Sequence, residues 1–312
     1  MVSLAVRFTR LFCRFSSKTP VVCVGGILAG GVGKTPIVRE IARRLNAPVV
    51  MRGYRGRNRK DGVPVKYVDL ARDVGDEAKM LVESGITVYV GDRRRNVEAI
   101  NYNSTAATAI VMDDGFQNPT VKKDVSVVVF DESVGVGNGL LLPAGPLRET
   151  IGSGLRRCDA VLIIQNGDGI ANTLGVIRAA RKLKKPVFFV RREMDAAGLF
   201  GKYVAFAGIG YPSKFFDSLR AVPSIRVVEK IPFSDHHYYD KNDIVRLFQA
   251  AKKYDARLIC TEKDWVKLPR NIKLKVRYAP LKITIQPNFY IWLEKKLALR
   301  EGDKNESKNQ NG

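Results

Sequence analysis

Ala29-Gly30-Gly31-Val32-Gly33-Lys34-Thr35 separates an apolar run, VVCVGG at 21–26, from TPIVREIARRLN, whose apolar spacing predicts a helix. A glycine-rich turn between a strand and a helix is the setting of a phosphate-binding loop, or P-loop. There, backbone N–H groups and the positive end of the helix dipole converge on phosphate oxygens. Such a loop uses its lysine, here Lys34, at the β/γ-phosphates and its hydroxyl residue, here Thr35, on Mg²⁺. We therefore expect the phosphate-binding residues to be Gly30, Gly31, Val32, Gly33, Lys34 and Thr35.

The match to the P-loop pattern is incomplete. The pattern G-x-x-x-x-G-K-[ST] places its first glycine at position 28, which is Leu28 here. Ala29 also stands where ParA-like ATPases carry a lysine. A glycine-rich turn that binds no ligand therefore stays an alternative at this point.

Acidic residues follow a second apolar run. Ala109 to Met112 leads directly into Asp113 and Asp114. An acid at the carboxyl end of a parallel strand lies beside the P-loop and can hold Mg²⁺. Neighbouring residues of a strand point in opposite directions, so one of the two acids should face the metal more directly. The alternative is a solvated turn, and Asp131, after VVVF, is a second and less specific candidate.

Strands and helices alternate along most of the chain. Apolar runs at 47–51, 86–90, 109–112, 125–130, 158–164 and 186–190 predict strands, with helical patterns between several of them. This order predicts an α/β fold of the P-loop NTPase type, with a doubly wound, mostly parallel sheet. A polar break at 191–199 predicts a domain boundary, followed by a second, smaller α/β domain. The polar tail at 301–312 shows no periodicity and is expected to be disordered.

The charge balance indicates an anionic partner. The chain has 312 residues, with 53 Lys and Arg against 31 Asp and Glu, giving a net charge of +22. Such an excess favours nucleic acid, an anionic membrane surface or a phosphorylated substrate. The four cysteines include no CxxC pair, and the only histidines, His236 and His237, are adjacent, so a zinc site is disfavoured.

The N-terminal segment has the pattern of a basic amphipathic helix. Within residues 1–15, apolar side chains fall on one stripe and Arg7, Arg10 and Arg14 on another. The arginines interrupt any signal-peptide core, and no apolar run of about 18 residues predicts a membrane span. The pattern favours a helix lying in a membrane interface, and a helix packed on the protein's own core is the alternative.

Eight short motifs occur in register along the chain. They are GGILAGGVGKTP (25–36), RGYRGR (52–57), GDEA (75–78), DDGFQNP (113–119), LLPAGPLRE (141–149), FAGIGYPSKFF (206–216), FSDHHYY (233–239) and TEKDWVKL (261–268). Together they resemble the tetraacyldisaccharide 4′-kinase family over residues 20–290. The resemblance implies transfer of the γ-phosphate of ATP to the 4′-hydroxyl of an acylated disaccharide 1-phosphate, giving lipid IVA in lipid A biosynthesis. It also implies a peripheral protein on the cytoplasmic face of the Gram-negative inner membrane.

The same resemblance assigns roles to residues. It implies that Lys34 and Thr35 bind nucleotide and Mg²⁺, that Asp113 and Asp114 are metal-associated acids, that Asp76 is the catalytic base and that His236 pairs with it. It also implies two domains, 1–190 and 191–286, joined by a two-stranded linker, with a last helix at 287–300 returning to the first. Arg148 follows a Pro- and Gly-rich turn near the carboxyl edge of the predicted sheet, which favours a place near the phosphates.

This chain departs from the family pattern at three positions. Gly26 replaces an asparagine, Leu28 replaces a small hydroxyl residue, and Asn118 replaces a histidine. Asn118 does not titrate near neutral pH, so a proton-transfer role is lost there and only positioning through its amide remains.

Two other functions are compatible with a basic chain. One is a ParA-like regulatory ATPase that binds DNA through its basic surface, and the other is a basic nucleic-acid module. Ala29 and the C-terminal α/β unit weigh against the first, and no helix–turn–helix, RRM or zinc-finger signature supports the second. No specific nucleic-acid partner is therefore expected. ATP turnover separates the remaining possibilities, because a lipid kinase requires the acylated disaccharide whereas a partitioning ATPase responds to DNA.

Overall fold

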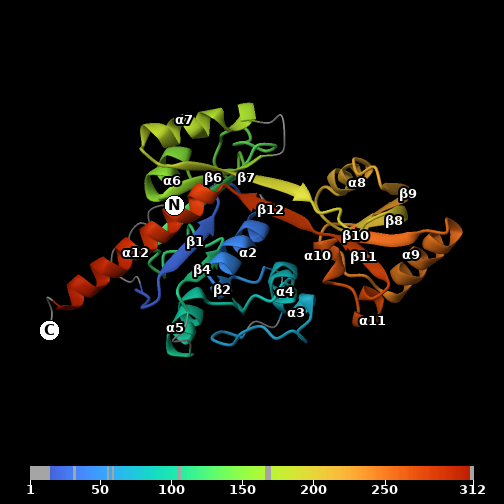
Figure 1. The fold of residues 1–312 in the computed structure, drawn as a ribbon, viewed down its shortest axis with the longest axis horizontal. Coiled ribbons are helices and arrows are strands. Elements are labelled where there is room, and N and C mark those ends of the chain that lie inside the picture. The colour runs from blue at the N-terminus through green and yellow to red at the C-terminus, as the bar shows by residue number, and fades with distance from the viewer. Residues whose placement is uncertain are drawn as a thin grey trace.

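The structure is a computed structural model. The residues that this structure describes are 15–30, 33–54, 56–57, 60–103, 107–165 and 170–309. The amphipathic pattern expected within residues 1–15 therefore lies outside the described residues, apart from Phe15. In the described part, the strands form two sheets (Figure 1).

The larger sheet has eight strands within the described residues, in the order β12-β7-β6-β5-β1-β4-β2-β3. Neighbouring strands pair in parallel, except for β12 and β7. Its strands are β1 (Val21–Gly25), β2 (Val49–Met51), β3 (Val88–Val90), β4 (Ile110–Asp113), β5 (Val125–Asp131), β6 (Ala160–Gln165), β7 (Val187–Met194) and β12 (Leu281–Ile285). β1, β4 and β5 are buried along their whole length, as expected for central parallel strands rich in Val and Ile.

Helices cover both faces of this sheet. Apolar side chains of α2, α4 and α12 pack on one face, and those of α5, α6 and α7 pack on the other. These helices are α2 (Lys34–Arg44), α4 (Asp76–Glu83), α5 (Arg93–Asn103), α6 (Ile151–Arg157), α7 (Leu174–Lys182) and α12 (Pro287–Asn309). The short helices α3 (Ala71–Val74) and η1 (Ile170–Thr173) precede α4 and α7. The predicted doubly wound α/β fold is confirmed.

The smaller sheet has four parallel strands within the described residues, in the order β11-β10-β8-β9. α8 packs on one of its faces and α9 on the other. Its elements are β8 (Gly201–Ala207), α8 (Pro212–Arg220), β9 (Ile225–Pro232), α9 (Lys241–Lys253), β10 (Arg257–Thr261), α10 (Glu262–Trp265), α11 (Arg270–Lys273) and β11 (Val276–Ala279). α9 begins where Asp240 and Asp243 form a reciprocal capping box. We call the parts around the larger and the smaller sheet the first and second lobes.

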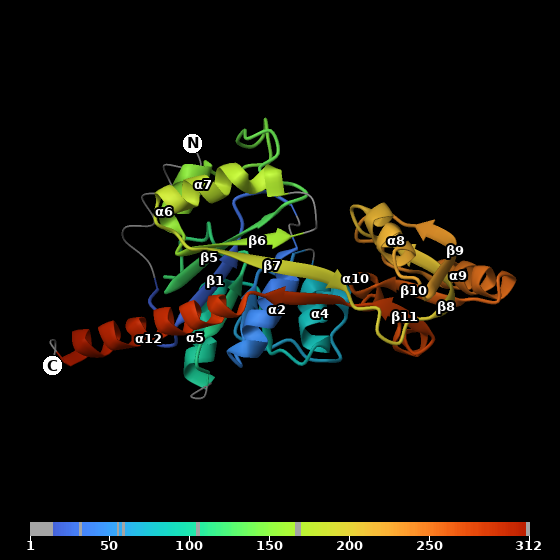
Figure 2. The ribbon, with the colours of Figure 1, turned by 45° about the horizontal axis from the view of Figure 1, so that its top comes forward.

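The two lobes are joined by an antiparallel ribbon. The chain leaves the first lobe on β7 and returns on β12, which pairs with β7 from Ile285–Val190 to Leu281–Met194 (Figure 2). The polar break expected at 191–199 is therefore wrong for residues 191–194, which continue β7. These residues lie between the lobes, where a strand has little apolar core to face, and this explains their polar composition.

The last helix extends beyond its expected end. α12 was expected over 287–300, followed by a disordered tail at 301–312, but the helix continues to Asn309. Its first turns bury Phe289 and Leu293 against the first lobe, and Figure 1 shows its C-terminal end extending away from both sheets. Within the described residues, no helix combines the length and the apolar character needed to cross a bilayer.

Candidate active site

The glycine-rich turn places Lys34 and Thr35 at the start of α2. Gly33 caps this helix with φ 72°, and Gly30 has φ 105°, which are backbone conformations that favour glycine. Gly31 and Val32 lie outside the described residues. Lys34 and Thr35 are both buried, in the first turn of α2, where backbone N–H groups have no partner within the helix.

Each of these side chains faces one of the two acids at the end of β4, Asp113 within the strand and Asp114 directly after it. β4 pairs directly with β1, so its carboxyl end lies beside the turn that follows β1. Lys34 Nζ lies 3.2 Å from Asp114 Oδ1, and Thr35 Oγ1 lies 3.4 Å from Asp113 Oδ2. The structure thus brings the glycine-rich turn and both predicted acids together.

Asp113 is a buried carboxyl with one unused oxygen. Its exposure is 3%, and Oδ1 has no hydrogen-bond partner among the described residues. Burial and, to a smaller extent, the charge of Glu77 raise the pKa of Asp113 to about 7, against the opposing charge of Lys34. A buried, unpaired carboxylate oxygen beside a threonine hydroxyl is a suitable donor for a hard cation such as Mg²⁺.

Asp114 lies in a different electrostatic environment. Its backbone has φ 47°, and Arg148 Nη1 lies 3.1 Å from Oδ1 and 3.0 Å from Oδ2. Burial alone would raise the pKa of Asp114, but the charges and hydrogen bonds of Lys34 and Arg148 lower it below its ordinary value. Asp114 is therefore an anion held between two cations, whereas Asp113 is the acid with an available oxygen.

Two arginines at this edge of the sheet were not identified from the sequence. Arg93 donates to the backbone carbonyls of Asp113 and Asp114, at 3.2 and 3.1 Å. Arg94 and Arg95, which follow it in the chain, are exposed, whereas Arg93 is not. Arg192, on β7, binds Asp131 at 3.1 Å, and its Nη1 lies 2.8 Å from where a Cβ on Gly33 would be. The sequence signal that could have identified Arg93 is its position at the start of a helix that follows a strand. No sequence signal identifies Arg192.

The second half of the site joins the two lobes. Asp76 is the first residue of α4 and is 4% exposed, and His236 lies in the turn after β9. His236 Nδ1 lies 2.9 Å from Asp76 Oδ2, although the residues are 160 positions apart. The Tyr238 hydroxyl donates to Asp76 Oδ1 at 3.3 Å, and Lys263 Nζ lies 3.2 Å from His236 Nε2. Neither Tyr238 nor Lys263 was singled out from the sequence.

The two halves of the site are close to one another. Glu77 follows Asp76 in the chain, and its charge acts on the carboxyl of Asp113. Asp76, Glu77 and His236 line a small pocket together with Met51, the last residue of β2. Both halves therefore lie near the carboxyl ends of first-sheet strands, which is where ligands bind in open α/β sheets. The arrangement can hold a phosphate chain at the glycine-rich turn and present a carboxylate to a group bound between the lobes.

Two further residues have structural roles. His237 does not join the site, because its Nε2 faces Asp243 at 2.7 Å and its ring stacks on Phe233. Asn118 Oδ1 accepts hydrogen bonds from the backbone N and the hydroxyl of Thr120, at 3.1 and 2.9 Å. The amide oxygen of Asn118 therefore closes a local turn rather than facing the site.

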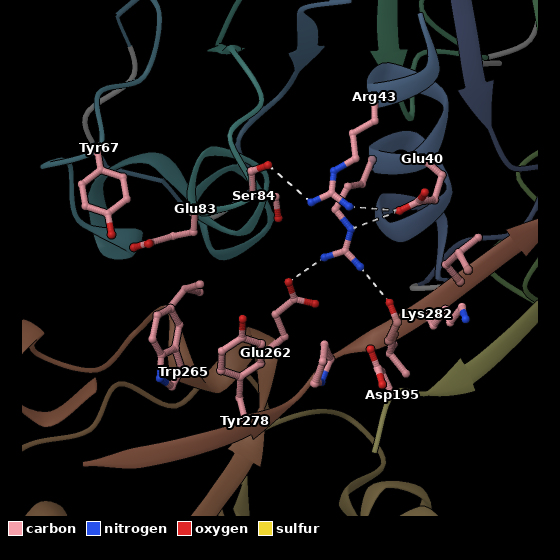
Figure 3. Close-up of a pocket in the computed structure, with 15 residues that line it drawn as sticks. Glu40, Arg43, Tyr67, Glu83, Ser84, Asp195, Glu262, Trp265, Tyr278 and Lys282 are labelled. Atoms are coloured by element: carbon pink, nitrogen blue, oxygen red, sulfur yellow. Dashed lines mark hydrogen bonds and ion pairs between the residues drawn. The ribbon is translucent and has the colours of Figure 1, made fainter. Parts of the chain in front are cut away.

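A cavity lies between the lobes, away from these site residues. It has a volume of about 620 Å³ and is lined by residues of α2, the end of α4, α10, β11 and β12 (Figure 3). Arg39 reaches across it to Glu262 Oε1 at 2.6 Å and to the carbonyl of Leu281 at 2.8 Å. None of the predicted site residues lines this cavity.

The fold and the paired acids beside the glycine-rich turn define a P-loop α/β protein equipped for phosphoryl transfer. A family model described as tetraacyldisaccharide-1-P 4′-kinase matches residues 2–298. The chain belongs to this kinase family.

Individual relatives agree with this assignment. The tetraacyldisaccharide 4′-kinase of Phenylobacterium zucineum is 41% identical over 275 residues, which are 86% of this chain and 81% of that protein. The kinase of Hyphomonas neptunium is 41% identical over 279 residues, which are 85% of this chain and 79% of that protein. A crystal structure of LpxK from Aquifex aeolicus in complex with ATP is 21% identical. It has a TM-score of 0.71 and covers 96% of this chain and 94% of its own, a likeness of fold.

Proposed function

We propose that this protein transfers the γ-phosphate of ATP to the 4′-hydroxyl of an acylated disaccharide 1-phosphate, forming lipid IVA. The observation that carries the proposal is the contact of Asp76 in the first lobe with His236 in the second, close to the acids at the end of β4. Membership of the kinase family supports the reaction and the lipid acceptor. No feature of the described residues favours the ParA-like alternative.

On the nucleotide side, the residues act as a cradle for phosphate. Gly30, Gly31, Val32 and Gly33 supply backbone N–H groups, and Lys34 supplies a positive charge at the β/γ-phosphates. Arg148 holds Asp114 in place and lies close enough to Lys34 to add charge at the same position. Phosphoryl transfer depends mainly on such positioning and charge stabilisation.

Mg²⁺ fits the remaining donors. Thr35 and Asp113 would hold the ion, with Asp113 Oδ1 available and Asp114 beside it. Mg²⁺ is usually bound by one or two protein oxygens together with substrate phosphates and water, so two side-chain donors would suffice. When bound, Mg²⁺ neutralises charge on the phosphates.

On the acceptor side, Asp76 is placed to take the proton of a sugar hydroxyl. His236 orients the Asp76 carboxylate through Oδ2, and Tyr238 does so through Oδ1. A carboxylate held on both oxygens by neighbours from the second lobe is in place only when that lobe is closed on the first. Closure would therefore assemble the base over the acceptor.

We also propose a peripheral location on the cytoplasmic face of the inner membrane. The net charge of +22 favours an anionic lipid surface, where each nearby cation contributes about 1 kcal/mol. Residues 1–15 supply a basic amphipathic segment for this contact. The two lobes then correspond to two domains. The first holds the nucleotide site, and the second supplies the residues that orient Asp76 toward the acceptor.

Phosphate transfer in detergent micelles tests the function. Labelled ATP and tetraacyldisaccharide 1-phosphate should give a labelled, doubly phosphorylated lipid that requires both Mg²⁺ and protein. ATP hydrolysis stimulated by DNA, without transfer to the lipid, would instead identify a ParA-like ATPase.

A further inference from the structure

One exposed loop of this highly charged chain contains no charged residue. Residues 134–147, VGVGNGLLLPAGPL, have neither acids nor bases, although 27% of the chain is charged. At their centre Leu140, Leu141 and Leu142 are 52%, 45% and 54% exposed. A run of three exposed leucines on a soluble surface marks an interaction site. We call residues 134–147 the leucine loop.

The leucine loop satisfies many of its own backbone polar groups. The hydrogen bonds are Leu142 N to Leu147 O (2.9 Å), Leu147 N to Leu140 O (3.1 Å), Gly145 N to Leu141 O (3.0 Å), Asn138 Nδ2 to Ala144 O (2.9 Å) and Leu140 N to Asn138 Oδ1 (3.1 Å). This matters because an unpaired backbone group is costly in an apolar medium. The tip of the loop, which carries the three leucines, can therefore enter an apolar medium at a low cost from unpaired backbone groups.

The base of the leucine loop is attached to the P-loop. Ala29 N donates to Pro146 O at 2.7 Å, and Arg148 N donates to Ile27 O at 2.8 Å. Leu147, unlike the three leucines at the tip, is buried. A surface contacted by the tip is thus held in a fixed relation to the nucleotide site.

Exposed cations follow the segment that contacts the loop. Asn172 donates to the carbonyl of Glu132 at 2.9 Å, and a Cβ on Gly135 would lie 2.7 Å from the Asn172 carbonyl. The short helix η1, which leads into α7, therefore lies against the start of the loop. Figures 1 and 2 both show the loop beside this end of α7. This segment exposes Ile170 and Leu174. Further along α7 and just beyond it lie the exposed cations Arg178, Arg181, Lys182 and Lys184.

We propose that the leucine loop inserts into the surface of an anionic phospholipid bilayer while the cations of α7 contact its headgroups. Apolar side chains flanked by Lys and Arg match a layer that is apolar inside and anionic outside. The proposal rests on the proposed function only in that the acceptor is a lipid. It adds a docking surface separate from residues 1–15 and brings the carboxyl edge of the sheet to the lipid.

Vesicle binding by the full chain tests the loop. Vesicles of phosphatidylglycerol and phosphatidylethanolamine, without the disaccharide, should bind the triple variant Leu140→Ser, Leu141→Ser, Leu142→Ser about 10-fold or more weakly than wild type. The matched control, Leu274→Ser, Val245→Ser, Ile291→Ser, removes exposed apolar side chains elsewhere and should bind as wild type. Equal binding by both triple variants would overturn the proposal, as would a changed oligomeric state of the loop variant without weaker vesicle binding.

A second variant reports insertion directly and keeps the loop apolar. Brominated lipid should quench the fluorescence of the Leu141→Trp variant more strongly than that of the wild type, which reports only the native tryptophans. The fluorescence of Leu274→Trp should be quenched no more than that of the wild type. Absence of excess quenching at position 141 would also overturn the proposal. Because these vesicles contain no acceptor, both results hold whether or not phosphate transfer is observed.

The cations of α7 are tested by salt dependence. Arg178→Gln with Arg181→Gln should weaken vesicle binding at low salt, and the difference should shrink at high salt. The control, Lys252→Gln with Lys253→Gln, removes exposed cations from α9 and should have no such effect. An equal effect of the two pairs would assign the attraction to net charge and remove α7 from the docking surface.

Discussion

Lys263 Nζ faces His236 Nε2 at 3.2 Å, on the opposite side of the ring from Asp76. An ammonium group has donors only, so Nε2 must be the acceptor and Nδ1 carries the proton given to Asp76. Lys263 thus favours the tautomer of His236 in which Nδ1–H donates to Asp76. Asp235 Oδ2 lies 3.8 Å from the same Nε2, beyond hydrogen-bond distance.

Replacing Lys263 should disturb this tautomer. Lys263→Met leaves Nε2 without its donor, and we expect phosphate transfer to fall by about 10-fold, the scale of lost support for an orienting group. Lys263→Arg should restore part of the loss. ¹⁵N NMR of the His236 ring, against Lys252→Met as control, should show Nε2 unprotonated in wild type. A protonated Nε2 in wild type would contradict the assignment.

Asp76 and His236 should act as a unit. Loss of a general base costs about 100-fold or more, so Asp76→Ala should reduce turnover on that scale, and His236→Ala should also reduce it. The double variant should lose much less than the product of the single losses. Rates of all four proteins at one pH measure this coupling. Multiplicative losses would mean that the residues act separately.

Lys34→Ala should separate catalysis from folding. The side chain supplies charge to the transferring phosphoryl group, so turnover should fall by at least about 100-fold. The fold should persist, because Asp114 keeps its partner Arg148 at 3.0 Å. Turnover and thermal unfolding are to be measured on the same preparation. Near-normal turnover would remove the glycine-rich turn from the nucleotide site.

Glu83 should make the attachment of the lobes pH-dependent. It binds Lys273 of the second lobe at 2.7 Å and Lys79 of its own helix at 3.3 Å. Burial alone would raise the pKa of Glu83, but hydrogen bonds from Lys273 and Tyr67 and the charges of Lys273 and Lys79 lower it. A lowered pKa stabilises the fold above the unfolded-state value of about 4.3, and this stabilisation is lost as pH falls through the folded-state value.

The measurement compares Glu83→Gln with wild type by thermal unfolding at several pH values. The variant should be less stable by about 1 kcal/mol at pH 7, and the difference should shrink below about pH 4. Glu98→Gln, which removes an exposed pair with Arg94 within α5, is the control and should change little. A difference that stays constant down to pH 3 would exclude the charge of Glu83 as its cause.

The central strands and the P-loop could be predicted because local sequence determines them. β1 and β5 are buried on both faces and therefore read as continuous apolar runs. Asp113 and Asp114 follow such a run, so their position at the sheet edge followed from the parallel topology. Which acid keeps an open oxygen did not, because that depends on Arg148 and Lys34 approaching Asp114 in three dimensions.

Other parts of the site depend on contacts between distant segments. Nothing in the residues near Asp76 or His236 pairs the two, and only the family resemblance predicted their contact. Arg192 was hidden in a stretch expected to be a break, because a strand of the ribbon between the lobes lacks the apolar alternation of a covered strand. Lys263 acts through the ring of His236, and nothing near it in sequence indicates this.

The order in which the chain is synthesised has a consequence for how it folds. β12 and α12 supply the edge strand and the buried Phe289 and Leu293 of the first lobe, yet they follow the whole second lobe. On the ribosome, the free edge of β7 and the core surface beneath α12 therefore stay uncovered until β12 and α12 emerge. Exposed strand edges of this kind favour pairing with other chains. The lobe whose synthesis begins first is thus completed only after the other lobe has been made.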